Sequence, residues 1–151
     1  MNDTPERPAV QRLRDSLAGT TARLEVGPLD VDDACHQYVE DGFDVTPQLR
    51  EFLETYGELT IVWPWRQWEE ELTTEAESAL DAPLRNVRNY ANRIGQPVLP
   101  IGAVFSSREY LLLAKNGDIL FAGDAGIQRV ANGFENAVRA LVSGDWDKTF
   151  F

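Results

Sequence analysis

Four short apolar runs, each bounded by turn residues, fill most of the last third of the chain, and they read VLPIGAVF, EYLLLAK, DILFAGD and IQRVA. Their β-branched and aromatic residues are typical of strands. Asn116-Gly117, between the second and third runs, is the strongest short hairpin signal, because a type I′ turn needs positive φ at both central positions. Asp124-Ala125-Gly126 predicts the next turn. We therefore expect a meander of antiparallel strands.

Helical periodicity surrounds this meander. The clearest helix is predicted over residues 46–57, with Thr46 as its N-cap, Pro47 at the first helical position and Gly57 at C′. Its apolar side chains form one stripe, made of Val45, Leu49, Phe52, Leu53 and Tyr56. Further helices are predicted over residues 10–17, 32–42 (capped by Asp32) and 134–142.

The stretch from Trp63 to Arg93 is acidic and rich in tryptophan. A strand is predicted over residues 59–63, and we expect helical structure beyond it. Thr74 and Glu77 have the spacing of a capping box and predict a short helix. A second helical stretch is predicted over residues 84–94, which Gly95 ends.

The predicted elements follow the order of an α+β domain: helices come first, then a strand meander, then a closing helix. We expect the helices to pack against a mixed or mainly antiparallel sheet. At 151 residues the chain has the length of one domain. We expect that domain over residues 10–146, between a loose N-terminal segment (1–9) and a C-terminal tail (147–151). Edge strands of the terminal meander are free to pair between subunits, which leaves a homodimer open.

Acidity is concentrated in the middle of the chain. The formal net charge is −11, and between Glu25 and Asp81 16 acidic side chains accompany only Arg50 and Arg66. Such a field repels nucleic acid and anionic lipid and steers basic partners. We expect a protein partner and neither nucleic acid nor membrane, although a gain in solubility explains the acidity equally well.

Neither a membrane span nor a secretory signal is indicated. No window approaches the ~18 uninterrupted apolar residues that a span requires. The opening MNDTPERPAV lacks a basic flank and an apolar stretch, and Cys35 is the only cysteine. A cytoplasmic location is expected.

The sequence holds no recognisable catalytic or metal-binding constellation. His36 is the only histidine, which excludes a multi-histidine metal site. Cys35 is adjacent to it, but neighbouring residues of a helix do not face each other. No glycine-rich phosphate loop and no nucleophile elbow is present. We expect no enzyme, no cofactor and no metal; a hydrolase with paired carboxylates in a cleft is the catalytic alternative.

The run WPWRQWEEE is the first candidate for binding another protein. Trp65 and Trp68 stand beside Glu69, Glu70 and Glu71, and aromatic anchors rimmed by charge are typical of interface hot spots. The structural alternative is that at least one of the three tryptophans in this run fills the core.

The acidic segment from Glu25 to Asp44 is the second candidate. We expect Asp41 and Asp44 to bind the partner. The alternative is a solvated face with helix-capping aspartates, and for Asp32 the capping interpretation is preferred.

Several segments, in order, resemble the third subfamily of the SUKH superfamily. They are TPQLREFLETYGEL, IGQPVLPIG, YLLLAKNGDILFAG and GFENAVRALVSGDW, and together they span roughly residues 10–146. The resemblance rests on shared order and spacing. It implies an α+β fold and a non-catalytic immunity protein that neutralises a cognate bacterial toxin, often a nuclease.

Two functional hypotheses follow. The first is an immunity protein that binds its toxin through an acidic surface, with a basic nuclease as one candidate partner. The second is a non-catalytic regulatory module that binds an endogenous protein.

Overall fold

The computed structural model describes residues 6–124 and 126–151. Seven strands form one antiparallel sheet in which each strand pairs with its neighbours in the chain, in the order β1 to β7. The strands are β1 (Arg23–Val26), β2 (Leu59–Trp65), β3 (Trp68–Thr73), β4 (Val98–Val104), β5 (Glu109–Ala114), β6 (Asp118–Gly123) and β7 (Gly126–Asn132). The helices are α1 (Pro8–Leu17), α2 (Val31–Glu40), α3 (Pro47–Tyr56), α4 (Ala76–Ala79), α5 (Leu84–Ile94) and α6 (Phe134–Ser143). The predicted α+β fold is confirmed.

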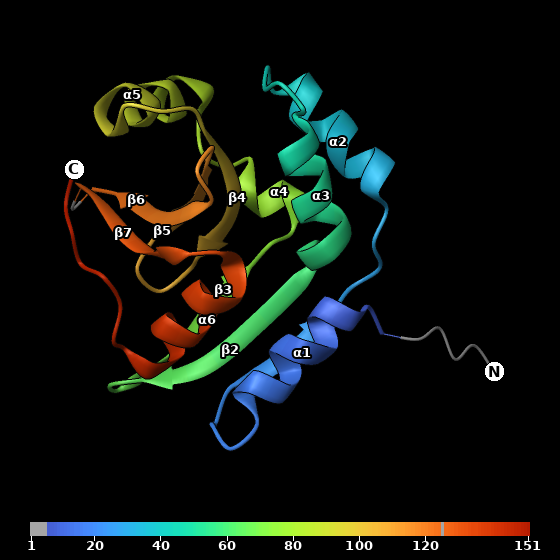
Figure 1. The fold of residues 1–151 in the computed structure, drawn as a ribbon, viewed down its shortest axis with the longest axis vertical. Coiled ribbons are helices and arrows are strands. Elements are labelled where there is room, and N and C mark those ends of the chain that lie inside the picture. The colour runs from blue at the N-terminus through green and yellow to red at the C-terminus, as the bar shows by residue number, and fades with distance from the viewer. Residues whose placement is uncertain (1–5, 125) are drawn as a thin grey trace.

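The sheet is strongly curved, and α1 and α6 lie along its inner side (Figure 1). We call this side the inner face; it carries a row of directly paired, buried residues, Leu24, Ile61, Leu72 and Val104. Directly paired residues of antiparallel strands point to the same side, so the whole row contacts the helices. Phe134 of α6 packs between Phe52 and Tyr56 of α3, with ring-centroid distances of 5.2 and 4.8 Å, and so joins α6 to α3.

The remaining helices pack around β4. Both α4 and α5 contact this strand, and α2 packs against α3 and α4. Tyr38 of α2 is fully buried, and its hydroxyl donates a hydrogen bond of 2.6 Å to the carbonyl oxygen of Pro100 in β4. This bond fastens α2 to the sheet at the irregularity between Pro100 and Gly102.

Local signals predicted α3 well and α2 less well. Thr46 accepts a hydrogen bond from the Leu49 amide, as an N-cap should. Gly57, however, is the C-cap with a φ of −66°, and the left-handed residue is Glu58. The predicted cap at Asp32 is wrong: Asp30 accepts from the Asp33 amide and caps α2, while Asp32 pairs with Arg50 at 2.7 Å.

The helical prediction for the start of the Trp63–Arg93 stretch is wrong, because β2 runs on to Trp65 and turns directly into β3. The predicted capping box is also wrong. Thr74 is buried between strands, where its hydroxyl accepts from the Leu59 amide and donates to the Tyr56 carbonyl. The short strand β1 was not predicted.

The predicted hairpin at Asn116-Gly117 joins β5 to β6, but its turn is not of type I′. Only Gly117 has positive φ (92°), and its amide donates to the carbonyl oxygen of Ala114. The Asn116 side chain accepts from the Asp118 amide and so shapes the turn. Of the next predicted turn, Ala125 lies outside the described residues, and β6 and β7 pair up to Gly123 and Gly126.

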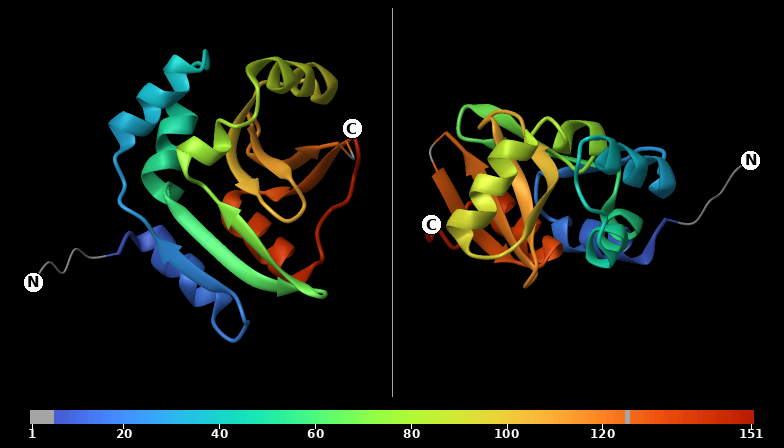
Figure 2. Two further views of the ribbon diagram at one scale, coloured as in Figure 1. Left: turned by 180° about the vertical axis from the view of Figure 1, so that it is seen from behind. Right: turned by 90° about the horizontal axis from the view of Figure 1, so that it is seen from above.

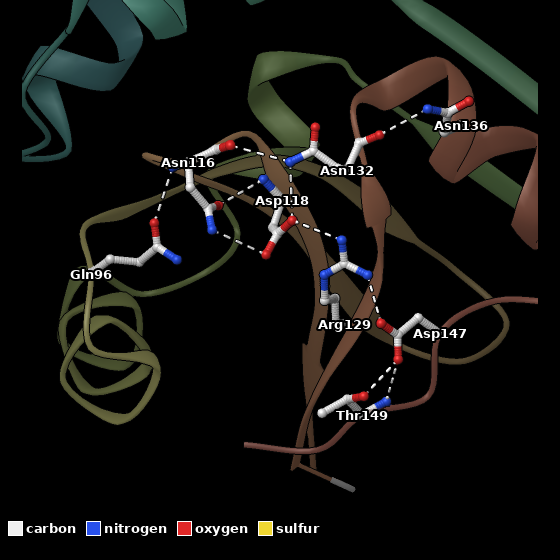
Figure 3. Close-up of polar contacts among 8 residues, drawn as sticks. All are labelled: Gln96, Asn116, Asp118, Arg129, Asn132, Asn136, Asp147 and Thr149. Atoms are coloured by element: carbon white, nitrogen blue, oxygen red, sulfur yellow. Dashed lines mark hydrogen bonds and ion pairs between the residues drawn. The ribbon is translucent and has the colours of Figure 1, made fainter.

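The C-terminal tail lies along the outer edge of β7. Thr149 accepts from the Arg129 amide at 2.9 Å, and the Phe151 amide donates to Ile127 at 3.0 Å. The Arg129 guanidinium bridges Asp118, at 3.1 Å, and Asp147, at 2.6 Å, within the polar network of Figure 3. Pairing between subunits through β7 would therefore require this tail to leave.

The opposite edge of the sheet is β1, only four residues long. The Arg14 guanidinium of α1 donates to the carbonyl oxygen of Leu24 there. Of the predicted segment 1–9, residues 1–5 lie outside the described residues. Arg7 donates to the carbonyl oxygens of Glu54 and Gly57, and Pro8 begins α1.

Replacing Tyr38 by Phe should lower the free energy of unfolding by about 1–3 kcal/mol, because the buried Pro100 carbonyl loses its donor. Urea unfolding with an unchanged m-value measures the change. The control is Tyr90→Phe on the partly exposed ring of α5, expected within about 0.5 kcal/mol of the parent. Equal losses in the two variants would contradict the role of the Tyr38 hydroxyl.

Candidate functional site

The β2–β3 hairpin carries five of the residues predicted to bind a partner, and its register sorts them by face. Trp65 pairs with Trp68, and Glu70 pairs with Trp63, so these side chains belong to the inner face. Glu69 pairs with Pro64 and Glu71 with Val62, and these four point to the opposite side. Glu69 and Glu71 therefore lie on one face of the sheet, and Glu70 lies on the other.

The opposite side of β1–β3 is open to solvent. Seen from behind, these strands face the viewer with α1 behind them (Figure 2, left). We call this surface the outer acidic face; it comprises Arg23, Glu25, Val62, Pro64, Glu69, Glu71 and Phe105.

On the outer acidic face the carboxylates of β3 lie between apolar residues, with Val62 and Pro64 of β2 on one side and Phe105 on the other. Phe105 is 47% exposed, and its amide donates to the carbonyl oxygen of Glu71, so it continues β4 along β3. Glu69 lies 3.3 Å from Arg23 in a solvent-exposed pair, which contributes little to stability and leaves the carboxylate accessible.

Glu70 is 6% exposed, although the sequence predicted it on the surface. Its Oε1 atom accepts from the amides of Glu71, at 3.0 Å, and Ser106, at 2.9 Å. The Ser106 hydroxyl donates to the Glu69 carbonyl oxygen at 2.8 Å. The buried carboxylate thus fixes the β4–β5 turn against β3.

A pocket of about 200 Å³ lies between the inner face of the hairpin and the end of α6. We call it the tryptophan pocket; its walls include Trp63, Trp65, Glu70, Glu109, Phe121 and Trp146. The Trp146 ring lies 6.1 Å from Trp65 and 6.0 Å from Phe121, centroid to centroid. The indole nitrogen of Trp63 is buried without an acceptor among the residues that the structure describes.

The tryptophan pocket is acidic. Burial raises the pKa of Glu109, and the nearby charge of Glu70 raises that pKa further. Arg66 lies at the exposed rim, with its guanidinium carbon 5.7 Å from the centroid of the Trp65 ring. Two carboxylates therefore share the pocket with one basic side chain.

The other predicted residues lie elsewhere. Trp68 is 49% exposed at the hairpin tip, outside the pocket lining. Asp41 and Asp44 are exposed just after α2, at the opposite end of the molecule from the hairpin tip in both views (Figures 1 and 2). The structure thus groups the hairpin residues and separates them from the two aspartates.

The pocket brings in residues that sequence reasoning did not single out. Glu109, Phe121 and Trp146 come from β5, β6 and the segment that follows α6. Nothing local distinguishes them from ordinary strand and tail residues, because only the tertiary fold places them together.

Within residues 6–124 and 126–151, no three His, Cys, Asp or Glu side chains are grouped as a metal ion would require. Nor does any helix there have the length and apolar character to cross a membrane. His36 lies on the surface, 2.9 Å from Glu40 one turn on in α2, and Cys35 is buried.

Comparison with protein families identifies one match: the family model described as SUKH-3 immunity protein matches residues 29–144. The chain belongs to the SUKH-3 immunity protein family. Searches of the curated proteins and of the solved structures found no match. Membership supports an immunity function and implies a cognate toxin as partner. The matched range of this SUKH-3 member includes the β2–β3 hairpin but not α1, β1 or the tail.

Replacing Gly144 by Ala should disturb the wall of the tryptophan pocket. A Cβ atom there would lie 2.7 Å from two atoms of the Trp65 ring, and the residue has a φ of 79°. Gly95 is the matched control, since it ends α5 with a φ of 87° and has open space around it.

We expect Gly95→Ala to cost about 1–2 kcal/mol from the backbone alone and Gly144→Ala to cost more. Only Gly144→Ala should change the tryptophan fluorescence of the folded protein. Identical fluorescence and stability in the two variants would contradict the packing of Trp65 on Gly144.

Proposed function

We propose that this SUKH-3 family member neutralises a cognate bacterial toxin in the cytoplasm by binding it through the outer acidic face. One observation carries the choice of surface: the exposed Phe105 and Pro64 lie beside Glu69 and Glu71 on an open sheet. Exposed apolar side chains interleaved with charged ones can contribute both buried area and charge complementarity to a protein interface. The proposed activity is binding rather than catalysis.

Charge gives the partner its chemistry. With a net charge of −11, the chain attracts a basic surface, such as the nucleic-acid-binding surface of a nuclease toxin. Covering that surface would exclude the toxin's substrate without any chemical step. Nucleic acid and anionic membranes are repelled by the same field.

The test of the proposed function is co-expression with the product of the adjacent reading frame. We expect the SUKH-3 member to restore growth that the product alone arrests, and to co-purify with it. Growth arrest that persists despite equal expression would contradict toxin neutralisation. If the adjacent genes form an unrelated operon and the chain co-purifies with an endogenous protein, the regulatory-module hypothesis is favoured.

The surface is tested by charge reversal. Changing Glu69 and Glu71 together to Lys should slow association with the toxin about tenfold at low salt, and dissociation should change less, because exposed charges act mainly on encounter. Surface plasmon resonance at two salt concentrations measures both rates, and the effect should shrink at high salt.

The control has the same change in charge at the other end of the molecule. Asp41 and Asp44, both changed to Lys, should leave association within about threefold of the parent at ~0.1 M salt, where the Debye length is ~10 Å and more distant charges are largely screened. If both double variants slow association equally, the net charge of the chain steers the partner and the outer acidic face is not the binding surface.

A further inference from the structure

The tryptophan pocket carries two carboxyl groups, one buried and one half-buried, that have no basic partner within ion-pair distance. Glu70 and Glu109 both line it, and neither forms an ion pair with a lysine or arginine of the described residues. Glu70 is 6% exposed and uses Oε1 for two backbone amides. Buried charges in proteins are normally paired, so this pocket favours a cationic ligand.

We propose that the tryptophan pocket binds a guanidinium or ammonium group, carried by an arginine or lysine side chain of the protein partner. The cationic ligand follows from the pocket itself, whereas its source on a protein partner rests on the proposed function.

The walls suit a cation as well as the carboxylates do. Three indole rings and the Phe121 ring line the pocket, and an aromatic face attracts a cation within about 6 Å of its centroid. Two of these indoles already receive cations of this chain: Arg66 lies 5.7 Å from Trp65, and the Lys148 ammonium 4.7 Å from Trp146. Aromatic walls and acidic groups together discriminate a cation from an apolar side chain of the same size.

Size and position favour a side chain of a bound protein. A volume of about 200 Å³ is below the ~300–1,000 Å³ typical of pockets for larger ligands. The rim adjoins the outer acidic face: Ser107, at the rim, is two residues from Phe105 in the same turn, and Ser106 is bonded to Glu69. A partner that covers Phe105 and Glu69 and extends around this turn therefore reaches the pocket with one side chain.

The first experiment uses the full chain and a probe pair, n-butylguanidinium and its uncharged isostere n-butylurea. The chain has four tryptophans, whose indole N–H signals report separately in ¹⁵N-correlated NMR spectra. We expect n-butylguanidinium to shift the signals of Trp63, Trp65 and Trp146, while Trp68, outside the lining, stays in place. Equal shifts with n-butylurea, or no shift with either compound, would overturn the cationic assignment.

Isosteric variants identify the groups responsible. Glu70→Gln keeps an oxygen for the Glu71 and Ser106 amides but removes the charge, and should weaken n-butylguanidinium binding about tenfold. Glu109→Gln should weaken it similarly. Glu71→Gln, on the opposite face of the same strand, is the matched control and should leave it unchanged. The dispersion of the NMR spectrum verifies that each variant is folded.

The source of the cation is tested in the complex with the adjacent reading frame's product. We expect the complex formed by Glu70→Gln to dissociate about tenfold faster than the parent complex. The complex formed by Glu71→Gln should change less. This outcome supports a basic side chain of the partner inserted in the pocket. Parent-like dissociation while n-butylguanidinium still binds would overturn that source and make the pocket a site for a free small cation. In that case toxin neutralisation itself would stand, because it is scored separately by growth and co-purification.

Discussion

The fold depends on closing the inner face of a sheet whose strands pair only with their neighbours in the chain. Such a meander curves but does not close, so its apolar inner face must be covered by helices. These come from both halves of the chain and meet where Phe134 packs between Phe52 and Tyr56. With α1 and α6 placed on the inner side and α4 and α5 around β4, no helix of the part of the chain that the structure describes lies on the outer side of β1–β3 (Figure 2).

The same geometry gives three consecutive glutamates different roles. Alternation along β3 sends Glu69 and Glu71 to solvent and Glu70 into the interior. Glu70 then fixes the turn that carries Phe105 and also lines the tryptophan pocket. One hairpin thus contributes to an open charged surface on one side and to an acidic cavity on the other.

The predictable parts of this structure are those with strong local signals. Thr46 and Pro47 before an apolar stripe identified α3, and Asn116-Gly117 identified the β5–β6 hairpin. The β2–β3 hairpin was missed because its turn has no glycine or asparagine: Arg66 adopts a φ of 57°, where few side chains are found. Without that turn signal, the following glutamates resembled an exposed helix.

The pocket was beyond sequence reasoning for a different reason. Glu70 looks like its two neighbours until the register of β3 is known. Trp146 looks like a tail residue until the tail is seen to lie along β7. Burial of a charge and convergence of distant rings are properties of the tertiary fold.

Both edges of the sheet are blunted, one by the tail along β7 and the other by the shortness of β1 and the Arg14 guanidinium on Leu24. A partner therefore gains little by adding a strand, and recognition must rely on side chains rather than on main-chain hydrogen bonds. Side chains on an open sheet face can be exchanged one at a time while the ladder beneath stays intact. The architecture thus lets the side chains of this face vary at little cost to folding.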